Sequence, residues 1–157
     1  MKPRLYLETT IPSYLVARQS RDLRLAADQE TTQEWWELRR HDFDLFISET
    51  VLREVGRGDI GFAAARLDRL RDIPVVSPTP MAALLAKRLL AEGVIPPLAA
   101  DDAVHLGLAA AHGMDFLLTW NCRHINNRSL QRRIEKICAD CELVCPVICT
   151  PMELMND

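Results

Sequence analysis

The segment ADDAVHLGLAAAHGMDFLLTWN, residues 100–121, contains a helix pattern followed directly by a strand pattern. Residues 99–111 are rich in Ala and Leu and predict a helix. Residues 116–120 are apolar on both faces, which is typical of a strand buried inside a parallel sheet. Asp101 and Asp102 stand in the first turn of the predicted helix, where unpaired backbone amides favour carboxylates. This segment therefore indicates an α/β protein built from βα units.

The rest of the chain repeats this alternation of short apolar runs and longer runs of helix formers. Strands are expected at residues 5–9, 43–48, 75–76 and 147–149. Helices are expected at residues 23–40, 50–55, 60–71, 81–90 and 129–139, and after Thr150-Pro151. Trp35 and Trp36 are expected to fill the core. Neither a repeat nor a Gly/Ser-rich linker divides residues 1–157, so we expect a single domain.

The composition is that of an ordinary globular protein. Hydrophobic residues make up 48% of the 157 positions, and the formal net charge is −3. A nucleic-acid partner would therefore have to bind a local group of arginines rather than bulk positive charge. The sequence contains no apolar run of the ~18 residues that a membrane span needs, and Met1 is not followed by a signal-peptide pattern. The chain is therefore predicted to be a soluble, cytoplasmic protein.

Carboxylate or amide side chains stand at four places where predicted strands end or predicted helices begin. These are Glu8, Glu54, the pair Asp101-Asp102, and Asn121. Groups at equivalent ends of βα units converge at the cleft beyond the carboxyl ends of a parallel sheet. Carboxylates crowded in a cleft repel one another unless a hard cation neutralises them. The sequence therefore predicts a Mg²⁺ or Mn²⁺ site.

Four segments together resemble the PIN-domain family, in particular its VapC-like toxin ribonucleases. They are LYLETTIPSYL (5–15), ISETVLREVGRG (47–58), ADDAVHLGLAAAHGMDFLLTWNCRHINN (100–127) and VICTPMEL (147–154), and residues 102–126 are the most specific part. The resemblance implies a three-layer α/β/α sandwich with a mostly parallel central sheet. It also implies a Mg²⁺- or Mn²⁺-dependent endoribonuclease, the toxin of a type II toxin–antitoxin pair, with RNA as substrate, a cognate antitoxin and a homodimer.

The resemblance carries over to the first acids unevenly. Family members usually have Asp followed by Thr or Ser at the end of the first strand, whereas this chain has Glu8 followed by Thr9. The extra methylene of Glu would move a bound metal. The family's second acid lies six residues after a Ser, and counting from Ser48 gives Glu54, with Glu49 as a near alternative.

The third acid of the family opens the helix, and here it is Asp102. Its neighbour Asp101 points about 100° away around the helix axis. The fourth position follows the strand and is Asn121, with His124 three residues later. An amide brings no negative charge, so a second metal is less well supported than the first.

The resemblance implies a role for each of these residues. Glu8 and Asp102 would bind the metal directly and Glu54 directly or through water, while Asn121 would orient water or substrate. Thr9 could hydrogen-bond a ligand carboxylate or the phosphate. RNA would be held by phosphate contacts from Arg123 and Arg128.

Two other interpretations stay open. The replacement of Asp by Glu8 and Asn121 also fits a catalytically weakened PIN fold that binds RNA or protein. Cys138, Cys141, Cys145 and Cys149 could hold zinc or an iron–sulfur cluster, although their spacing matches no common motif and favours structural thiols. His105, on an apolar helix, is expected to be a packed, hydrogen-bonded histidine rather than a ligand.

Overall fold

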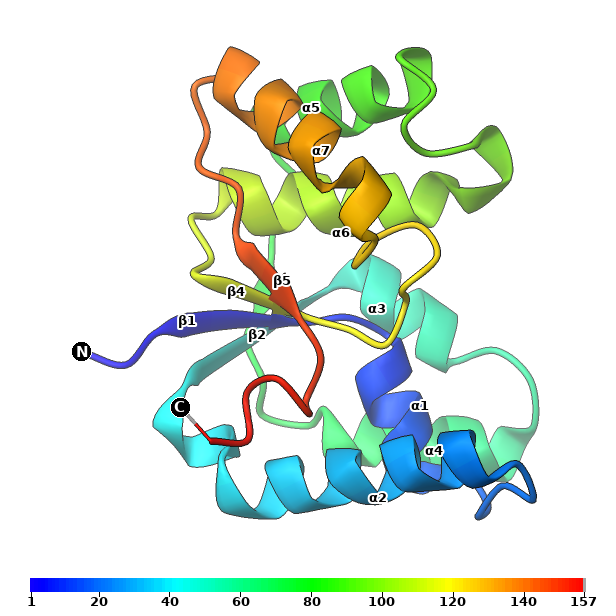
Figure 1. Ribbon diagram of the computed structural model, residues 1–157. Helices are drawn as coiled ribbons and strands as arrows, with labels where there is room; N and C mark the ends of the chain where they lie inside the picture. Colours follow the sequence, from blue (N-terminus) through cyan, green and yellow to red (C-terminus); the bar gives the residue numbers. More distant parts are fainter. Residues whose placement is uncertain (157) are drawn as a thin grey trace.

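The computed structural model describes residues 1–156, which form a parallel sheet between two layers of helices (Figure 1). The strands are β1 (Arg4–Leu7), β2 (Asp44–Ser48), β3 (Val75–Val76), β4 (Phe116–Leu118) and β5 (Val147–Cys149). They lie in the order β3-β2-β1-β4-β5, and every neighbouring pair is parallel. The predicted α/β/α architecture is therefore confirmed.

Helices cover both faces of the sheet. They are α1 (Thr10–Val16), α2 (Leu23–Leu38), α3 (Glu49–Val55), α4 (Ile60–Arg69), α5 (Pro80–Ala91), α6 (Ala100–Ala111) and α7 (Arg128–Asp140), with short 3₁₀ turns at η1 (Arg40–Asp42) and η2 (Pro97–Ala99). Helices α5, α6 and α7 lie on one face and α1, α2 and α4 on the other (Figure 1). Five of these helices begin at a side chain that accepts a backbone N–H: Asp22, Ser48, Asp59, Thr79 and Asn127.

The centre of the sheet is the most deeply buried part of the protein. Leu5, Tyr6 and Leu7 of β1, and Leu117 and Leu118 of β4, have no exposed surface. Strand β1 pairs with β2 on one side and with β4 on the other. The strand order therefore reverses between β1 and β4. Ligands of open parallel sheets bind beyond the carboxyl ends of the strands at such a point.

Two sequence expectations about helices were wrong. Residues 151–154 form a turn rather than a helix after Thr150-Pro151. Conversely, no helix was expected between the first strand and residue 23, where helix α1 forms. Pro12 is the third residue of α1, within the first turn, where its missing N–H costs no intrahelical hydrogen bond.

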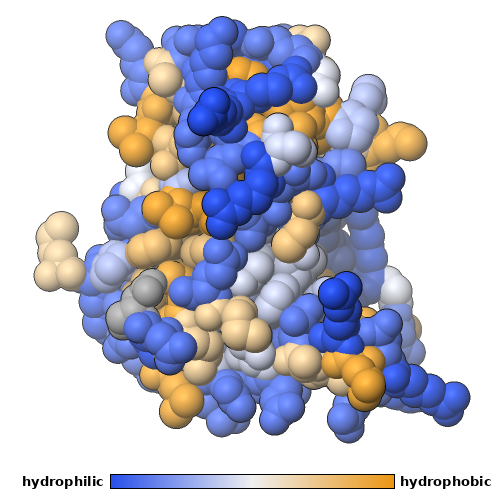
Figure 2. All heavy atoms as spheres, viewed as in Figure 1, coloured by the Kyte–Doolittle hydropathy of each residue, from blue (hydrophilic) through white to orange (hydrophobic). Residues whose placement is uncertain are grey.

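Trp35 and Trp36 fill the core beneath the sheet, as expected from the sequence. They are 0% and 7% exposed. These two side chains therefore cannot form an exposed apolar face for a homodimer. The face of the molecule drawn in Figure 2 is mainly hydrophilic, with hydrophobic side chains in small separate groups. No helix within residues 1–156 is both long and apolar enough to cross a membrane.

Helices α5 and α6 approach closely because Gly107 has no side chain. A Cβ atom at this position would lie 2.4 Å from the carbonyl oxygen of Ala82. We expect Gly107→Ala to lower the free energy of unfolding by about 1–3 kcal/mol through this overpacking, measured by urea denaturation. Gly61→Ala is the matched control, because a Cβ there meets only the flexible Asp59 side chain at 3.2 Å. Equal stability of the two variants would contradict the prediction.

Candidate active site

Several of the predicted site residues lie together at the carboxyl edge of the sheet. Glu8 follows β1, Asn121 lies three residues beyond the end of β4, Glu54 is on α3, and Asp102 is in the first turn of α6. In Figure 1 the strand β1 runs toward the side where α3, the loop after β4 and the start of α1 meet. This is the reversal point between β1 and β4, as the spacing of the acids predicts.

Glu8 is held firmly between the ends of β1 and β4. Its side chain is buried, 3% exposed. Its Oε1 accepts hydrogen bonds from the Thr10 amide (3.1 Å), the Thr10 hydroxyl (2.5 Å) and the Thr119 hydroxyl (2.6 Å). Three donors saturate this oxygen. A cation could therefore use only Oε2 of Glu8.

Glu54 is held by two donors from different elements. Its Oε1 accepts from the Thr9 hydroxyl at 2.7 Å and from Nε2 of His105 at 2.6 Å. Burial by itself raises the pKa of Glu54, but the hydrogen bonds from His105 and Thr9 and the nearby charge of His105 outweigh it, so the pKa lies below its ordinary value. Glu54 is therefore an ionised carboxylate with a fixed orientation.

A buried chain of hydrogen bonds supports Glu54 from behind. His105 has no exposed surface, and its Nδ1 is 2.7 Å from the Tyr6 hydroxyl, which is 2.7 Å from the Ser48 hydroxyl. An ionised carboxylate only accepts, so Nε2 of His105 carries a proton. With a neutral ring, Nδ1 accepts from Tyr6. Burial raises the pKa of Tyr6, so its hydroxyl stays protonated.

The donor-to-acceptor direction of these hydrogen bonds is fixed at Ser48, the residue before α3. Ser48 caps the helix by accepting the Val51 amide at 3.3 Å, so its own proton is available for the Tyr6 oxygen. Each hydroxyl in the chain then donates once and accepts once. The expectation that His105 is a packed, hydrogen-bonded histidine is confirmed, and in addition it connects the core of the sheet to Glu54.

Asp102 carries an unfavourable negative charge. Burial raises its pKa, and the charge of Glu54 raises it further. A hydrogen bond from Asn121 and the nearby His105 and His124 lower it, without cancelling the effect of burial. Asp102 and Glu54 are therefore close enough to repel each other, and together they form a locally anionic edge.

The Asn121 amide shapes the loop after β4. Its Oδ1 accepts the backbone amide of His124 at 3.0 Å, and its amino group, as a donor, lowers the pKa of Asp102. That Asn121 orients water or substrate stays a prediction.

Two of the alternative acids lie apart from this group. Asp101 forms an ion pair with Arg53 at 2.7 Å, on the other side of α6. Glu49 is exposed at the start of α3. His124, in contrast, lies close enough to influence Asp102. Glu54, rather than Glu49, is thus the α3 acid that meets Asp102.

The residues predicted to contact RNA follow Asn121 in the sequence: Arg123 lies on the loop and Arg128 begins α7. Arg123 and Arg128 are both exposed. Trp120 is partly buried, stacks on Tyr14 with ring centroids 5.8 Å apart, and donates from Nε1 to Thr32 at 2.7 Å. The indole is therefore already engaged within the protein, whereas the two arginines point to solvent.

Sequence reasoning missed the partners that hold the acids in place. These are Tyr6, Thr10, Ser48 and Thr119, together with the contact between His105 and Glu54. One signal was present: His105 follows Asp102 by three residues, a spacing that places both on the same face of a helix. The hydroxyl partners lie next to strand ends that look like ordinary core sequence, so no pattern distinguishes them.

The group can be tested for its fit to a divalent cation. Within residues 1–156, no three His, Cys, Asp or Glu side chains lie close enough together to hold a metal ion as they stand. Mg²⁺, however, is commonly held by one or two carboxylates, with waters and substrate phosphates completing the octahedron. Asp102 fits that requirement, and so does Glu54 through Oε2, because its Oε1 already accepts two hydrogen bonds. Glu8 likewise fits through Oε2, and the Asn121 oxygen already accepts one hydrogen bond, which leaves it one lone pair.

The cysteines at the end of the chain do not form a separate metal site in the described residues. Cys138, Cys141 and Cys149 are buried and no disulfide is present among them. A hydrogen bond from the Cys145 thiol lowers the pKa of Cys138. No group of three metal-ligating side chains was found in this part of residues 1–156, which favours structural thiols over a zinc or iron–sulfur centre.

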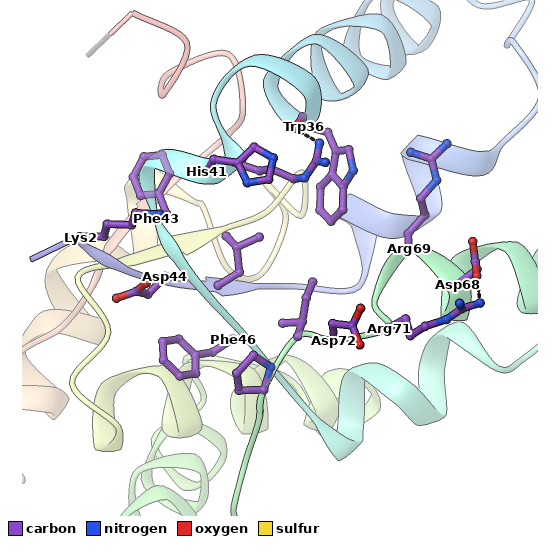
Figure 3. Close-up of a pocket in the computed structure, with 14 residues that line it drawn as sticks. Lys2, Trp36, His41, Phe43, Asp44, Phe46, Asp68, Arg69, Arg71 and Asp72 are labelled. Atoms are coloured by element: carbon purple, nitrogen blue, oxygen red, sulfur yellow. Dashed lines mark hydrogen bonds and ion pairs between the residues drawn. The ribbon is translucent and has the colours of Figure 1, made fainter.

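A hollow of about 600 Å³ lies at the opposite, amino end of the sheet. It lies between Trp36 and His41 on one side and Arg71 and Asp72 on the other (Figure 3). It exists because β2 extends past β3, which pairs only with the last two residues of β2. None of the predicted site residues lines it. The carboxylates therefore lie at a different place from this hollow.

Comparison with known proteins does not identify the chain. Neither a scan of protein-family models nor a search of curated protein sequences found a match. The arguments for function therefore rest on the motifs of the sequence and on the geometry of the carboxyl edge.

Proposed function

We propose that this protein is a Mg²⁺- or Mn²⁺-dependent endoribonuclease of the PIN type. The observation that carries the proposal is the position of Glu54 at the reversal point of a parallel sheet, where it is hydrogen-bonded to a buried histidine, His105, that follows Asp102 by three residues on α6. A structural role alone does not require two mutually repelling carboxylates on different helices. The quoted PIN-like segments supply the reaction class.

The residues of the chain have separable tasks in this proposal. Glu54 and Asp102 would hold the cation, which when bound would lower the pKa of a water and offset charge on the phosphate. His105 and Thr9 fix the Glu54 carboxylate. Asn121 fixes Asp102. Such preorganised ligands do not have to reorient when substrate arrives.

In this proposal the RNA is bound by residues that follow β4. Arg123 and Arg128 are exposed there, and guanidinium groups pair well with phosphate oxygens. These contacts would position the RNA backbone without reading its sequence. Cytoplasmic location, a homodimer and a cognate antitoxin that covers the acids belong to the same proposal. A small reading frame directly beside the gene would support the toxin role.

The proposal is tested by cleavage and by metal binding in parallel. Purified protein is incubated with a single-stranded RNA pool and Mg²⁺ or Mn²⁺, with EDTA as the control. Thermal unfolding is followed over the same metal concentrations, since a ligand that binds the folded state raises its stability. Metal-dependent cleavage that Glu8→Gln or Asp102→Asn abolishes supports the proposal. Undiminished cleavage in both variants removes it.

A second candidate function is a weakened PIN fold that binds RNA or protein without cutting. It is favoured by the three hydrogen bonds that occupy Oε1 of Glu8 and by the occupied oxygen of Asn121. Both leave fewer oxygens for a metal. The two functions differ in metal titration, because the binding module shows no saturable response to millimolar Mn²⁺.

Asn121→Asp is expected to strengthen metal binding and weaken the metal-free protein. The new carboxylate would face Asp102 and replace a hydrogen bond with repulsion, at a cost of about 1–3 kcal/mol in the free energy of unfolding. Added Mn²⁺ should raise the melting temperature of this variant by more than that of the wild type. Asn126→Asp, on the same loop and bonded to Glu153 instead, is the control. An equal Mn²⁺ response in the wild type and Asn121→Asp contradicts the prediction.

A further inference from the structure

A smaller hollow opens beside the acids, on the other side of α6. It encloses about 280 Å³ between α3, α5, α6 and the segment after β3. Its walls are small or apolar side chains: Val76, Pro78, Ala82, Ala83, Ala86, Val104 and Leu108. Its polar side chains come from α3 and the start of α5: Ser48, Glu49, Thr50, Arg53 and Thr79. An apolar hollow with a few polar groups on one side is the usual form of a small-ligand site.

This hollow is physically connected to the carboxylates. Ser48 lines it and also belongs to the hydrogen-bonded chain that reaches Glu54 through Tyr6 and His105. Val104 lines it and is the neighbour of His105 on α6. The ion pair between Arg53 and Asp101 joins a residue that lines the hollow to the sequence neighbour of Asp102 on α6. The hollow and the acids therefore share two helices, α3 and α6.

The apolar walls offer a surface for a base ring. Ala82 and Ala86 of α5 are 5% and 8% exposed, and with Val104 and Leu108 of α6 they line the hollow. Bases of single-stranded RNA are unstacked and can be held against apolar surfaces, and enzymes that act on nucleic acids read such bases through their Watson–Crick edges in closely fitting pockets. The hollow is at the small end of ligand-site volumes, which suits one base.

The polar side of the hollow selects among the four bases. The carboxylate of Glu49 only accepts hydrogen bonds, and it can accept two in parallel. Among the RNA bases, only guanine presents two adjacent N–H donors, N1–H and the N2 amino group, on its Watson–Crick edge. Arg53 uses Nη2 for Asp101 at 2.7 Å and keeps further N–H groups that could donate to guanine O6.

We infer that this hollow binds one guanine base of the RNA and that Glu49 selects it. The inference rests on the proposed function for the identity of RNA as substrate, and it adds the base and the residue that reads it. Glu49, which is exposed at the start of α3, thereby acquires a role in recognition. Glu49 is then a specificity residue rather than a metal ligand.

Nucleoside binding tests the inference without any need for cleavage. Guanosine, adenosine, cytidine and uridine are titrated separately into ¹⁵N-labelled protein without metal, and amide shifts are followed. Guanosine should give saturable shifts at Thr50, Thr79 and Val104. Glu49→Gln should weaken guanosine binding roughly tenfold, the usual effect of one bidentate contact. Absence of saturable binding, or equal binding of all four nucleosides, overturns the inference.

Two variants on α5 distinguish the effect of filling the hollow from the effect of adding a tryptophan to the helix surface. Ala83 is exposed and lines the hollow, so Ala83→Trp should fill it and abolish guanosine binding without disturbing the core. Leu84 is 46% exposed on the same helix and does not line the hollow, so Leu84→Trp should bind guanosine as the wild type does. Equal binding by both variants overturns the inference.

Mapping of cleavage sites in a random RNA pool distinguishes this inference from the proposed function. Guanine should occur at one fixed position relative to the cut, and Glu49→Gln should reduce that preference roughly tenfold while cleavage continues. Cleavage without a guanine preference overturns the inference and leaves the nuclease proposal standing. Guanosine binding as described, in a protein that cuts no RNA, upholds the pocket and removes the nuclease.

Discussion

Asp102→Asn is expected to lower metal-dependent RNA cleavage by at least about a hundredfold, the usual loss when a group that stabilises developing charge is removed. The reason lies in the charge at the carboxyl edge. Asp102 and Glu54 repel each other, and burial already opposes the charge of Asp102. A cation relieves both effects. With Asn at position 102, a single carboxylate remains opposite the incoming phosphate.

The same substitution should leave the metal-free protein as stable as the wild type, or more stable by up to about 1 kcal/mol, since buried charge at functional sites usually lowers stability. Asn can keep the hydrogen-bonding contact with Asn121 while removing the repulsion from Glu54. Thermal unfolding in EDTA measures this difference in stability between the metal-free variant and the wild type. Added Mn²⁺ should raise the melting temperature of the wild type and have much less effect on Asp102→Asn.

The neighbouring residue provides a matched control. Asp101→Asn removes the same charge one position away, but Asp101 faces Arg53 across an exposed ion pair. Exposed ion pairs contribute about 0–1 kcal/mol. We expect Asp101→Asn to change the cleavage rate by no more than a few fold. If both variants lose activity equally, or neither does, Asp102 is not the ligand described above.

Much of the fold could be predicted from the sequence because its signals are local. The run from Phe116 to Leu118 is apolar on both faces, and this pattern occurs where helices cover both sides of a sheet. The runs of helix formers at residues 50–55 and 81–90 correspond to α3 and α5, which begin directly after the capping side chains Ser48 and Thr79. The two errors, at Pro12 and Thr150-Pro151, concern segments of seven residues or fewer, in which tertiary contacts outweigh local preference.

The site was predictable in position but not in detail. That acids after β1 and on α3 and α6 meet at one edge follows from the geometry of parallel strands. Which oxygen of Glu8 is saturated, and which end of the Asn121 amide faces Asp102, depend on hydroxyl and amide partners far away in the sequence. A hydrogen bond between Thr119 and Glu8 joins residues separated by 111 positions, and no spacing rule anticipates it.

The buried chain from Ser48 to Glu54 has a consequence for both stability and function. Polar groups inside a protein are costly unless each one is satisfied. Here Tyr6 and His105 are fully buried and satisfied by each other and by the groups on either side. Removal of His105 takes one hydrogen-bond partner from Tyr6 and one from Glu54 at once. His105 is therefore the residue whose loss should affect stability most.

His105→Ala is expected to lower the free energy of unfolding by about 3 kcal/mol, from unsatisfied partners and a new cavity. Tyr6→Phe, which removes one hydroxyl and keeps the ring, should cost only about 1 kcal/mol. Urea denaturation measures both. If His105→Ala is no less stable than Tyr6→Phe, the chain of hydrogen bonds does not stabilise the core as described.

Two conservative variants separate the stabilising role of His105 from its positioning of Glu54. The side-chain amide of Gln reaches the place of Nε2 and can still donate to Glu54, whereas Asn reaches only toward Tyr6. We expect His105→Gln to retain metal-dependent cleavage within about tenfold and His105→Asn to lose ten- to a hundredfold, as partners of metal ligands do. Both variants should be compared at a temperature where each is fully folded. Equal cleavage by the two would mean that His105 supports the fold without orienting Glu54.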